Sequence, residues 1–264
     1  MKTSRWAGAV IAVASLAGLV MLTWPLLVHR AASAEPVQPP LVFLLLVPVV
    51  IVVALSELTQ GGVDPRVLAV LGVLSAIDAV LRGISAGVAG VELVFFLLIL
   101  GGRVFGAGFG FVLGCTSLLA SALLTGGVGP WLPYQMLVSA WVGMGAGLLP
   151  RARGKVEIAL LVAYGIVASY LYGLLLNLQG WPLLAGVAVP GHTGDLSFDP
   201  SASLAHNLAT FGKYTLLTST GGWDTGRAIT TAVAVAVLGP AVLTTLRRAA
   251  RRSQVVGSVV GSSA

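Results

Sequence analysis

Apolar residues occupy eight long runs along the chain, and short polar or Gly/Pro-rich segments separate them. Each run has about the length of a helix that crosses a bilayer, which takes roughly 20 residues. Polarity does not alternate within the runs, as it would in a membrane β-strand. The sequence therefore predicts an all-α fold, a polytopic membrane helical bundle. The predicted spans are residues 7–28, 41–58, 67–84, 86–102, 104–124, 131–149, 158–176 and 229–246.

The first run has two interpretations. Ala32-Ser33-Ala34 resembles a signal-peptide cleavage site, but the apolar part of a signal peptide spans about 7–15 residues. The run at 7–28 is longer, so we interpret it as a retained helix. The chain then divides into an N-terminal transmembrane hairpin at 1–58, a membrane domain at 67–252 and a flexible tail at 253–264.

Composition supports the membrane assignment. Of 264 residues, 57% are hydrophobic and 9% are charged, whereas soluble domains carry about 25% charged residues. The net charge of +6 does not indicate a nucleic-acid partner, because the basic residues flank the apolar runs. The single cysteine, Cys115, allows no intrachain disulfide and no zinc-binding pattern. We therefore expect no metal and no cofactor.

The basic residues also predict an orientation. With eight spans both termini share one side, and placing them in the cytoplasm puts 11 basic residues inside and 4 outside. Cytoplasmic loops carry an excess of Lys and Arg, so we expect a multi-pass cell-membrane protein with both termini cytoplasmic. The outer four are Arg30, Arg82, Lys213 and Arg227.

One stretch, Gly126-Gly127-Val128-Gly129-Pro130, interrupts the apolar pattern and is followed by polar aromatic residues. Gly and Pro end a helix here, at the outer end of the predicted span 131–149. Aromatic side chains with polar tips suit a membrane–water boundary. They line an outward pocket or form an ordinary interfacial belt. The candidate ligand-binding residues here are Trp131, Tyr134, Gln135 and Trp141.

Further polar residues fall on the same predicted outer side. Asp224 is expected to cap the last span at its N-terminus, and Arg227 then lies in the first turn, where the helix dipole disfavours a cation. Arg227 pairs with Asp224 or meets an anionic ligand group. The long connection at 179–222 is either a lid or a passive connector. The additional candidate binding residues are Glu92, Asn177, Trp223, Asp224 and Arg227.

Small residues recur at helical spacing on three of the spans. Such stripes let helices approach closely, either inside this protein or against a partner. On the third span, Asp78 and Arg82 lie one turn apart and are able to pair, as structural glue or as a cavity wall. The stripes are Gly72, Ser75, Ala76 and Ala79; Gly106, Gly110 and Gly114; and Ser139, Gly143 and Gly147.

Three segments carry a family resemblance: Phe109-Gly110-Phe111-Val112-Leu113-Gly114, the stretch 126–137, and the stretch 141–150. They resemble the core of substrate-binding S components of energy-coupling factor (ECF) transporters, and are most similar to an actinobacterial vitamin-type group. The resemblance covers roughly residues 67–252 and implies a six-helix core. The two N-terminal spans depart from that pattern.

The resemblance implies a membrane-embedded subunit of an ABC importer that captures a vitamin or similar micronutrient, with cobalamin as one candidate. It also implies a membrane-embedded T component and two ATPase subunits as partners, since this chain has no nucleotide-binding motif. In the family, a small-residue stripe on the first core helix contacts the T component. The matching residues here are Gly72, Ser75, Ala76 and Ala79.

Two other functions are alternatives for a membrane bundle of this kind. An accessory or scaffold subunit would have its outer cavity filled by its own side chains. An intramembrane enzyme would need catalytic groups within the spans, but His29, His192 and His206 all fall in predicted outer loops. We therefore expect no catalytic residues and no enzymatic activity.

Overall fold

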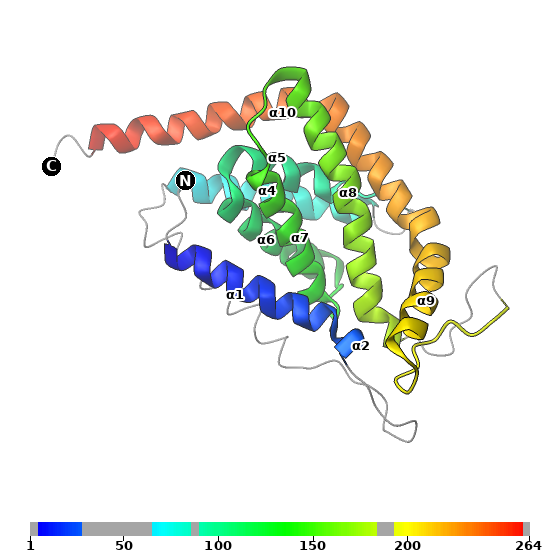
Figure 1. Cartoon of the computed structure of the whole chain (residues 1–264). Coiled ribbons are helices and arrows are strands. Elements are labelled where there is room, and N and C mark those ends of the chain that lie inside the picture. Colours follow the sequence, from blue (N-terminus) through cyan, green and yellow to red (C-terminus); the bar gives the residue numbers. More distant parts are fainter. Residues whose placement is uncertain (1–4, 28–64, 86–89, 184–192, 261–264) are drawn as a thin grey trace.

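The computed structural model describes residues 5–27, 65–85, 90–183 and 193–260 (Figure 1). Every regular element in these ranges is helical, which confirms the all-α prediction. The predicted second span, 41–58, lies outside the described residues. In chain order the elements are α1 (Arg5–Leu22), α2 (Trp24–Leu27), α4 (Pro65–Ser85), α5 (Val94–Phe105), α6 (Ala107–Thr125), α7 (Leu132–Leu148), α8 (Gly154–Gly180), η1 (Trp181–Leu183), α9 (Leu204–Thr215), η2 (Leu216–Asp224) and α10 (Thr225–Val260).

The lengths of the helices agree with a membrane bundle. Four described segments are long and apolar enough to cross a bilayer, namely Pro65–Ser85, Ala107–Thr125, Gly154–Leu183 and Leu204–Arg251. Two shorter apolar helices, Gly8–Leu22 and Val94–Phe105, accompany them. Many of their apolar side chains face outward, as expected where lipid replaces water. The structure is therefore that of a polytopic helical membrane protein.

Helix α5 forms the centre of the bundle. Its residues Val94 to Gly102 are all buried, and it contacts α4, α6, α7, α8 and α10. A helix that is apolar on all sides is stable only when other helices surround it. The Phe95 ring packs edge-on against Tyr172 of α8, with 5.0 Å between ring centroids. This buried helix fixes the positions of the elements around it.

Glycines allow three helices to meet without side chains between them. A Cβ atom on Gly102 of α5 would lie 1.9 Å from the carbonyl oxygen of Gly143 of α7, and one on Gly110 of α6 would lie 2.2 Å from it. A Cβ on Gly114 would lie 2.4 Å from the Ala140 nitrogen. These contacts confirm the predicted tight packing for Gly110, Gly114 and Gly143.

The prediction for Gly106 is confirmed for the close packing but not for its place within a helix. Gly106 lies between α5 and α6 with a φ of +97°, and a Cβ atom on Gly147 of α7 would lie 2.7 Å from its carbonyl carbon. L-residues with side chains rarely adopt this φ, so glycine suits the break. The span predicted to begin at 104 accordingly begins at Ala107.

The predicted break before the last span was wrong. Helix α9, the π-helix η2 and α10 follow one another without interruption, so Gly221 and Gly222 lie inside a helical segment. Asp224 is therefore no N-terminal cap; its carboxylate accepts hydrogen bonds from other side chains instead. Further on, Pro240 lies within α10, and α10 changes direction along its length (Figure 1). A proline removes a helical hydrogen bond and favours such a bend.

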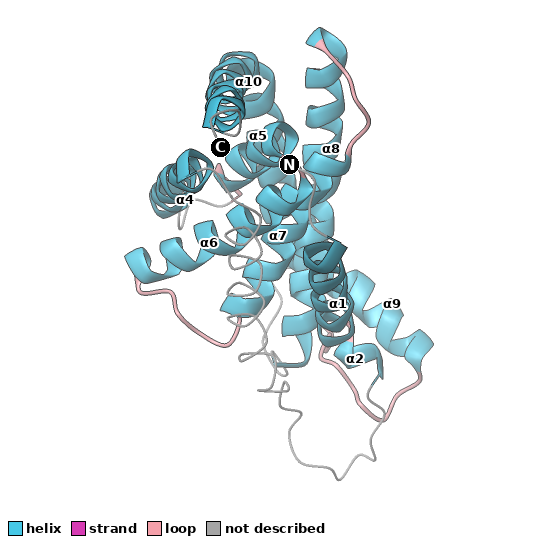
Figure 2. Ribbon diagram, turned by 90° about the vertical axis from the view of Figure 1, so that its left-hand side faces the viewer, coloured by secondary structure: helices cyan, strands magenta, loops and turns pink. Residues whose placement is uncertain are grey.

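Helix α1 runs along the outside of the bundle (Figure 2) and contacts α7 and α8. Trp141 of α7 donates a hydrogen bond from Nε1 to Ser15 Oγ of α1, at 2.8 Å. The start of α1 and the far end of α10 lie on the left of Figure 1, whereas α2 and α9 lie on the right. This arrangement puts the first and last described helical ends on one side.

Candidate functional site

A cavity of about 270 Å³ opens between the end of α4, the start of α5, the end of α6 and the junction of η2 with α10. It is on the side that the charge distribution assigned to the exterior. Charged, aromatic and small residues line it. They are Arg82, Ser85, Gly90, Val91, Glu92, Thr125, Trp223 and Arg227.

One wall depends on a close approach between two glycines. Gly90 has a φ of +72°, and a Cβ atom there would lie 2.7 Å from the Cα of Gly226. Thr230 Oγ1 also reaches the Gly90 carbonyl, at 3.5 Å. The segment before α5 is thereby held against α10. This contact brings Glu92 next to Arg227.

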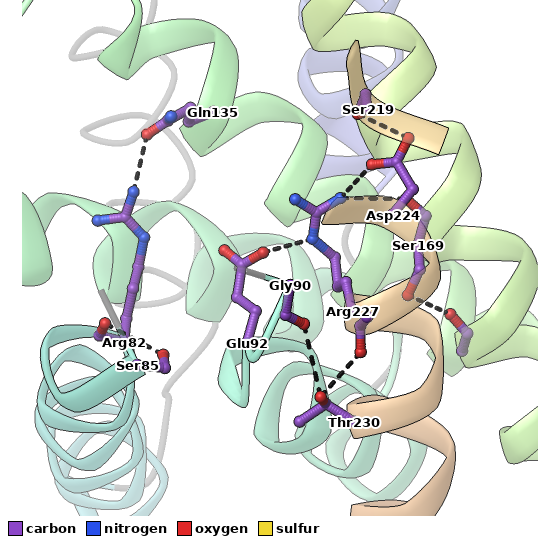
Figure 3. A network of polar contacts seen from close by, with 12 residues as sticks. Arg82, Ser85, Gly90, Glu92, Gln135, Ser169, Ser219, Asp224, Arg227 and Thr230 are labelled. Atoms are coloured by element: carbon purple, nitrogen blue, oxygen red, sulfur yellow. Dashed lines mark hydrogen bonds and ion pairs between the residues drawn. The ribbon is translucent and has the colours of Figure 1, made fainter. Parts of the chain in front are cut away.

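Arg227 is the centre of a polar network on this wall (Figure 3). Its Nε donates to Glu92 Oε2, and its NH1 donates to Asp224 Oδ1 at 2.9 Å and to the Ser169 carbonyl at 3.3 Å. The guanidinium also lies over the Tyr172 ring, 4.8 Å from its centroid, in a cation–π contact. The predicted pairing of Arg227 with Asp224 is confirmed.

The π-helix η2 positions the side chains of Trp223 and Asp224. Asp224 is 1% exposed and accepts a second hydrogen bond from Ser219 Oγ at 2.8 Å. A Cβ atom on Gly173 of α8 would lie 1.9 Å from Asp224 Oδ1, so only glycine leaves room for this carboxylate. Trp223 instead lines the cavity. Short π-helical segments occur frequently at functional sites.

Arg82 lies on the opposite wall (Figure 3). It donates from NH1 to Ser121 Oγ and from NH2 to Gln135 Oε1, each at 3.1 Å. It takes part in none of the ion pairs among the described residues, and so does not pair with Asp78, which is fully buried one turn earlier. The sequence suggested the cavity-wall role only as one of two alternatives. The feature of the sequence that indicates this role is the position of Arg82, a cation, within an apolar run.

The four predicted ligand-binding residues at the start of and within α7 do not lie together at the cavity. Gln135 reaches the cavity through Arg82. Tyr134 is buried in the core, and Trp131 is half-exposed at the start of α7. Trp141 faces α1. Trp131, Tyr134 and Trp141 are not among the cavity-lining residues.

Two other predicted features lie outside this cavity. The buried Asn177 Nδ2 has no hydrogen-bond partner among the described residues. The later part of the long connection, from residue 193 onward, packs on Trp181, whose Nε1 donates to the Leu196 carbonyl at 2.6 Å. Among the described residues of the long connection and of the π-helix η2, Trp223 alone lines the cavity.

The small-residue stripe of α4 divides between two faces. Ser75 and Ala79 are buried, and the Ser75 and Thr116 hydroxyl oxygens lie 2.7 Å apart. Gly72 and Ala76 are exposed, and a Cβ atom on Gly72 would meet nothing within 4 Å. Within the part of the chain that the structure describes, Gly72 and Ala76 are therefore left uncovered on the outside of α4.

The part of the chain that the structure describes holds no cluster of three His, Cys, Asp or Glu residues suited to a metal ion. The cavity is lined by hydrogen-bonding and charged groups. Among known families, the model described as "ECF transporter, substrate-specific component" matches residues 66–250. No curated protein and no solved structure matches the chain.

Proposed function

Because this chain belongs to the family of substrate-specific components of ECF transporters, we propose that it captures its solute in the cavity between Arg82 and the Glu92–Arg227 pair. Proteins of this family are membrane-embedded transporter subunits rather than enzymes. The observation that carries the proposal is a polar cavity in an otherwise apolar bundle, with charged groups on two facing walls. Binding pockets of this kind combine apolar walls with a few orienting polar groups.

The cavity favours a particular class of solute. Arg82 has no carboxylate partner within ion-pair distance among the described residues, whereas Arg227 has two. An anionic or hydrogen-bond-accepting group on the solute would meet Arg82, and a planar part would lie beside Trp223. A volume of about 270 Å³ suits a small vitamin-like compound better than cobalamin, which is far larger. Gln135 and Asp224 act as positioning residues for the two arginines.

Replacing Arg82 by glutamine is expected to weaken solute binding at least about tenfold, because hydrogen bonds to a charged group contribute about 1.5–3 kcal/mol. Mass spectrometry of small molecules retained by the purified chain identifies the solute, and calorimetry with that compound measures the loss. Lys213→Gln is the matched control, since Lys213 is exposed on α9 and does not line the cavity. Equal affinities of the two variants would exclude this cavity, and absence of any retained compound would favour a scaffold subunit.

The orientation proposed from the basic residues places this cavity outside the cell and both termini in the cytoplasm. Arg82 and Arg227 lie at the cavity, whereas Arg103, Arg151 and Arg247 lie around a second cavity at the other ends of the helices. A solute is therefore captured on the side from which an importer takes it up.

We expect the exposed part of the α4 stripe to contact the T component, which itself works with the ATPase subunits in this family. Gly72→Leu or Ala76→Leu should reduce co-purification with the T component several-fold, because a large side chain prevents close helix approach. Solute affinity should not change. Ala163→Leu is the matched control, since Ala163 is exposed on α8. Co-purification equal to that of this control would assign the contact to another face.

A further inference from the structure

A second, larger cavity of about 1020 Å³ lies at the other ends of the helices. The end of α5, the connection from α7 to α8, the start of α8 and the far part of α10 enclose it. Five arginines line this cavity together with a single carboxylate, that of Glu157. Its lining is therefore strongly cationic.

Two of these arginines are already occupied. Arg103 Nε and Arg247 NH2 both donate to Glu157 Oε1, at 2.7 and 2.6 Å. Arg103 also donates from NH1 to the carbonyl oxygens of Leu149 and Pro150, each at 3.0 Å. These bonds fix the α7–α8 connection against α5 and α10. Glu157 is 2% exposed, and its carboxylate is paired with Arg103 and Arg247.

The other three arginines, Arg151, Arg153 and Arg251, are exposed and form no hydrogen bond or ion pair with another described residue. They come from two segments that the Glu157 pairs hold together. We propose that this cavity binds the phosphate group of an anionic phospholipid. Guanidinium groups match phosphate oxygens in pairs, and basic pockets between helices on the cytoplasmic side suit such head groups.

The surroundings favour a lipid over a free phosphate compound or an acidic protein segment. The cavity wall includes the apolar residues Val104 and Leu149. Leu148 and Val156, next to the lining residues, are 68% and 70% exposed. Apolar surface beside a cationic cavity at the helix ends accommodates acyl chains and a head group together. This proposal rests on the inner-leaflet orientation and not on the solute cavity.

The test uses the full-length purified chain and native mass spectrometry with phosphatidylglycerol or phosphatidylcholine as the added lipid. Arg151→Gln/Arg251→Gln should lower phosphatidylglycerol affinity by about five-fold for each arginine. The control is Lys155→Gln/Arg248→Gln, which removes the same charge from the neighbourhood of the same two segments, the start of α8 and the far part of α10, but outside the cavity lining. This control should retain the affinity of the unmodified chain.

Four results would overturn the proposal. The first is an equal loss of phosphatidylglycerol affinity in the two double variants. The second is phosphatidylcholine binding as tight as that of phosphatidylglycerol. Inorganic phosphate at millimolar concentration displaces the lipid, which would assign the cavity to free phosphate compounds. Alternatively, the Arg151/Arg251 variant loses the T component while lipid binding is unchanged, which would assign the arginines to a protein partner. Solute binding, measured on the same samples, reports separately on the outer cavity.

Discussion

Replacing Gly143 by alanine is expected to destabilise the bundle by about 3 kcal/mol, the upper end of the effect of overpacking a core. The backbones of α5, α6 and α7 meet at this residue, where a Cβ atom would lie 2.2 Å from the Gly110 carbonyl oxygen. Backbone atoms cannot rotate away as a flexible side chain does, so the helices themselves have to separate. Thermal or denaturant unfolding in detergent measures the loss.

Gly72→Ala is the matched control for this change. Gly72 also lies within an apolar helix, but a Cβ atom there meets nothing within 4 Å. Alanine is a better helix former than glycine by about 1 kcal/mol, so this variant should be as stable as the unmodified chain or more so. Similar destabilisation by both substitutions would show that the packing of α5, α6 and α7 does not explain the effect.

Replacing Arg227 by methionine is expected to lower the free energy of unfolding by about 3–5 kcal/mol, as when one partner of a buried ion pair is removed. The substitution leaves Asp224, which is 1% exposed, without its cation and removes the partner of Glu92. It also removes the cation over the Tyr172 ring. The measurement is unfolding without added solute.

Two further variants test this explanation. Arg248→Met changes an exposed arginine on the same helix and should alter stability by less than about 0.5 kcal/mol. Adding Asp224→Asn to Arg227→Met should recover part of the lost stability, because the unpaired buried charge is then gone. A double variant less stable than Arg227→Met alone would contradict the assigned role of Asp224.

The helices of the central bundle were predictable because local signals mark their ends. Gly126 to Pro130 separates α6 from α7, and a run of basic residues separates α7 from α8. The family match over residues 66–250 agrees with the extent that the resemblance gave. Hydropathy and glycine spacing therefore established both the fold class and the tight packing of α6 on α7.

The continuous final helix was not predictable from local signals. Gly221-Gly222 is typical of a helix break, yet the chain continues through it as a π-helix. Contacts that local sequence does not reveal hold this segment: the Asp224 carboxylate fits against Gly173 of α8 and pairs with Arg227. Tertiary packing outweighed the propensity of the two glycines.

The residues that line the cavity were predictable only in part, because some of their partners come from distant segments. Glu92, Trp223 and Arg227 are predicted site residues because they fall near the ends of outer segments, and they lie together at the cavity. Arg82 was considered with Asp78, four residues away, but its hydrogen bonds go to Ser121 and Gln135 on other helices. The residue type of Trp141 predicts a binding role, but its indole nitrogen donates a hydrogen bond to Ser15 of α1. Partners from distant segments cannot be derived from spacing along one helix.

The unbroken helix has a mechanical consequence. Trp223 borders one chamber and Arg247 the other, and at 1.5 Å per residue about 36 Å of helix separates them. A hydrogen-bonded rod of this length resists compression, and its compliant points are the π-helical segment and Pro240. A change in the angle between the part of α10 that borders the first cavity and the part that borders the second is therefore expected to occur at Pro240, which lies between Trp223 and Arg247.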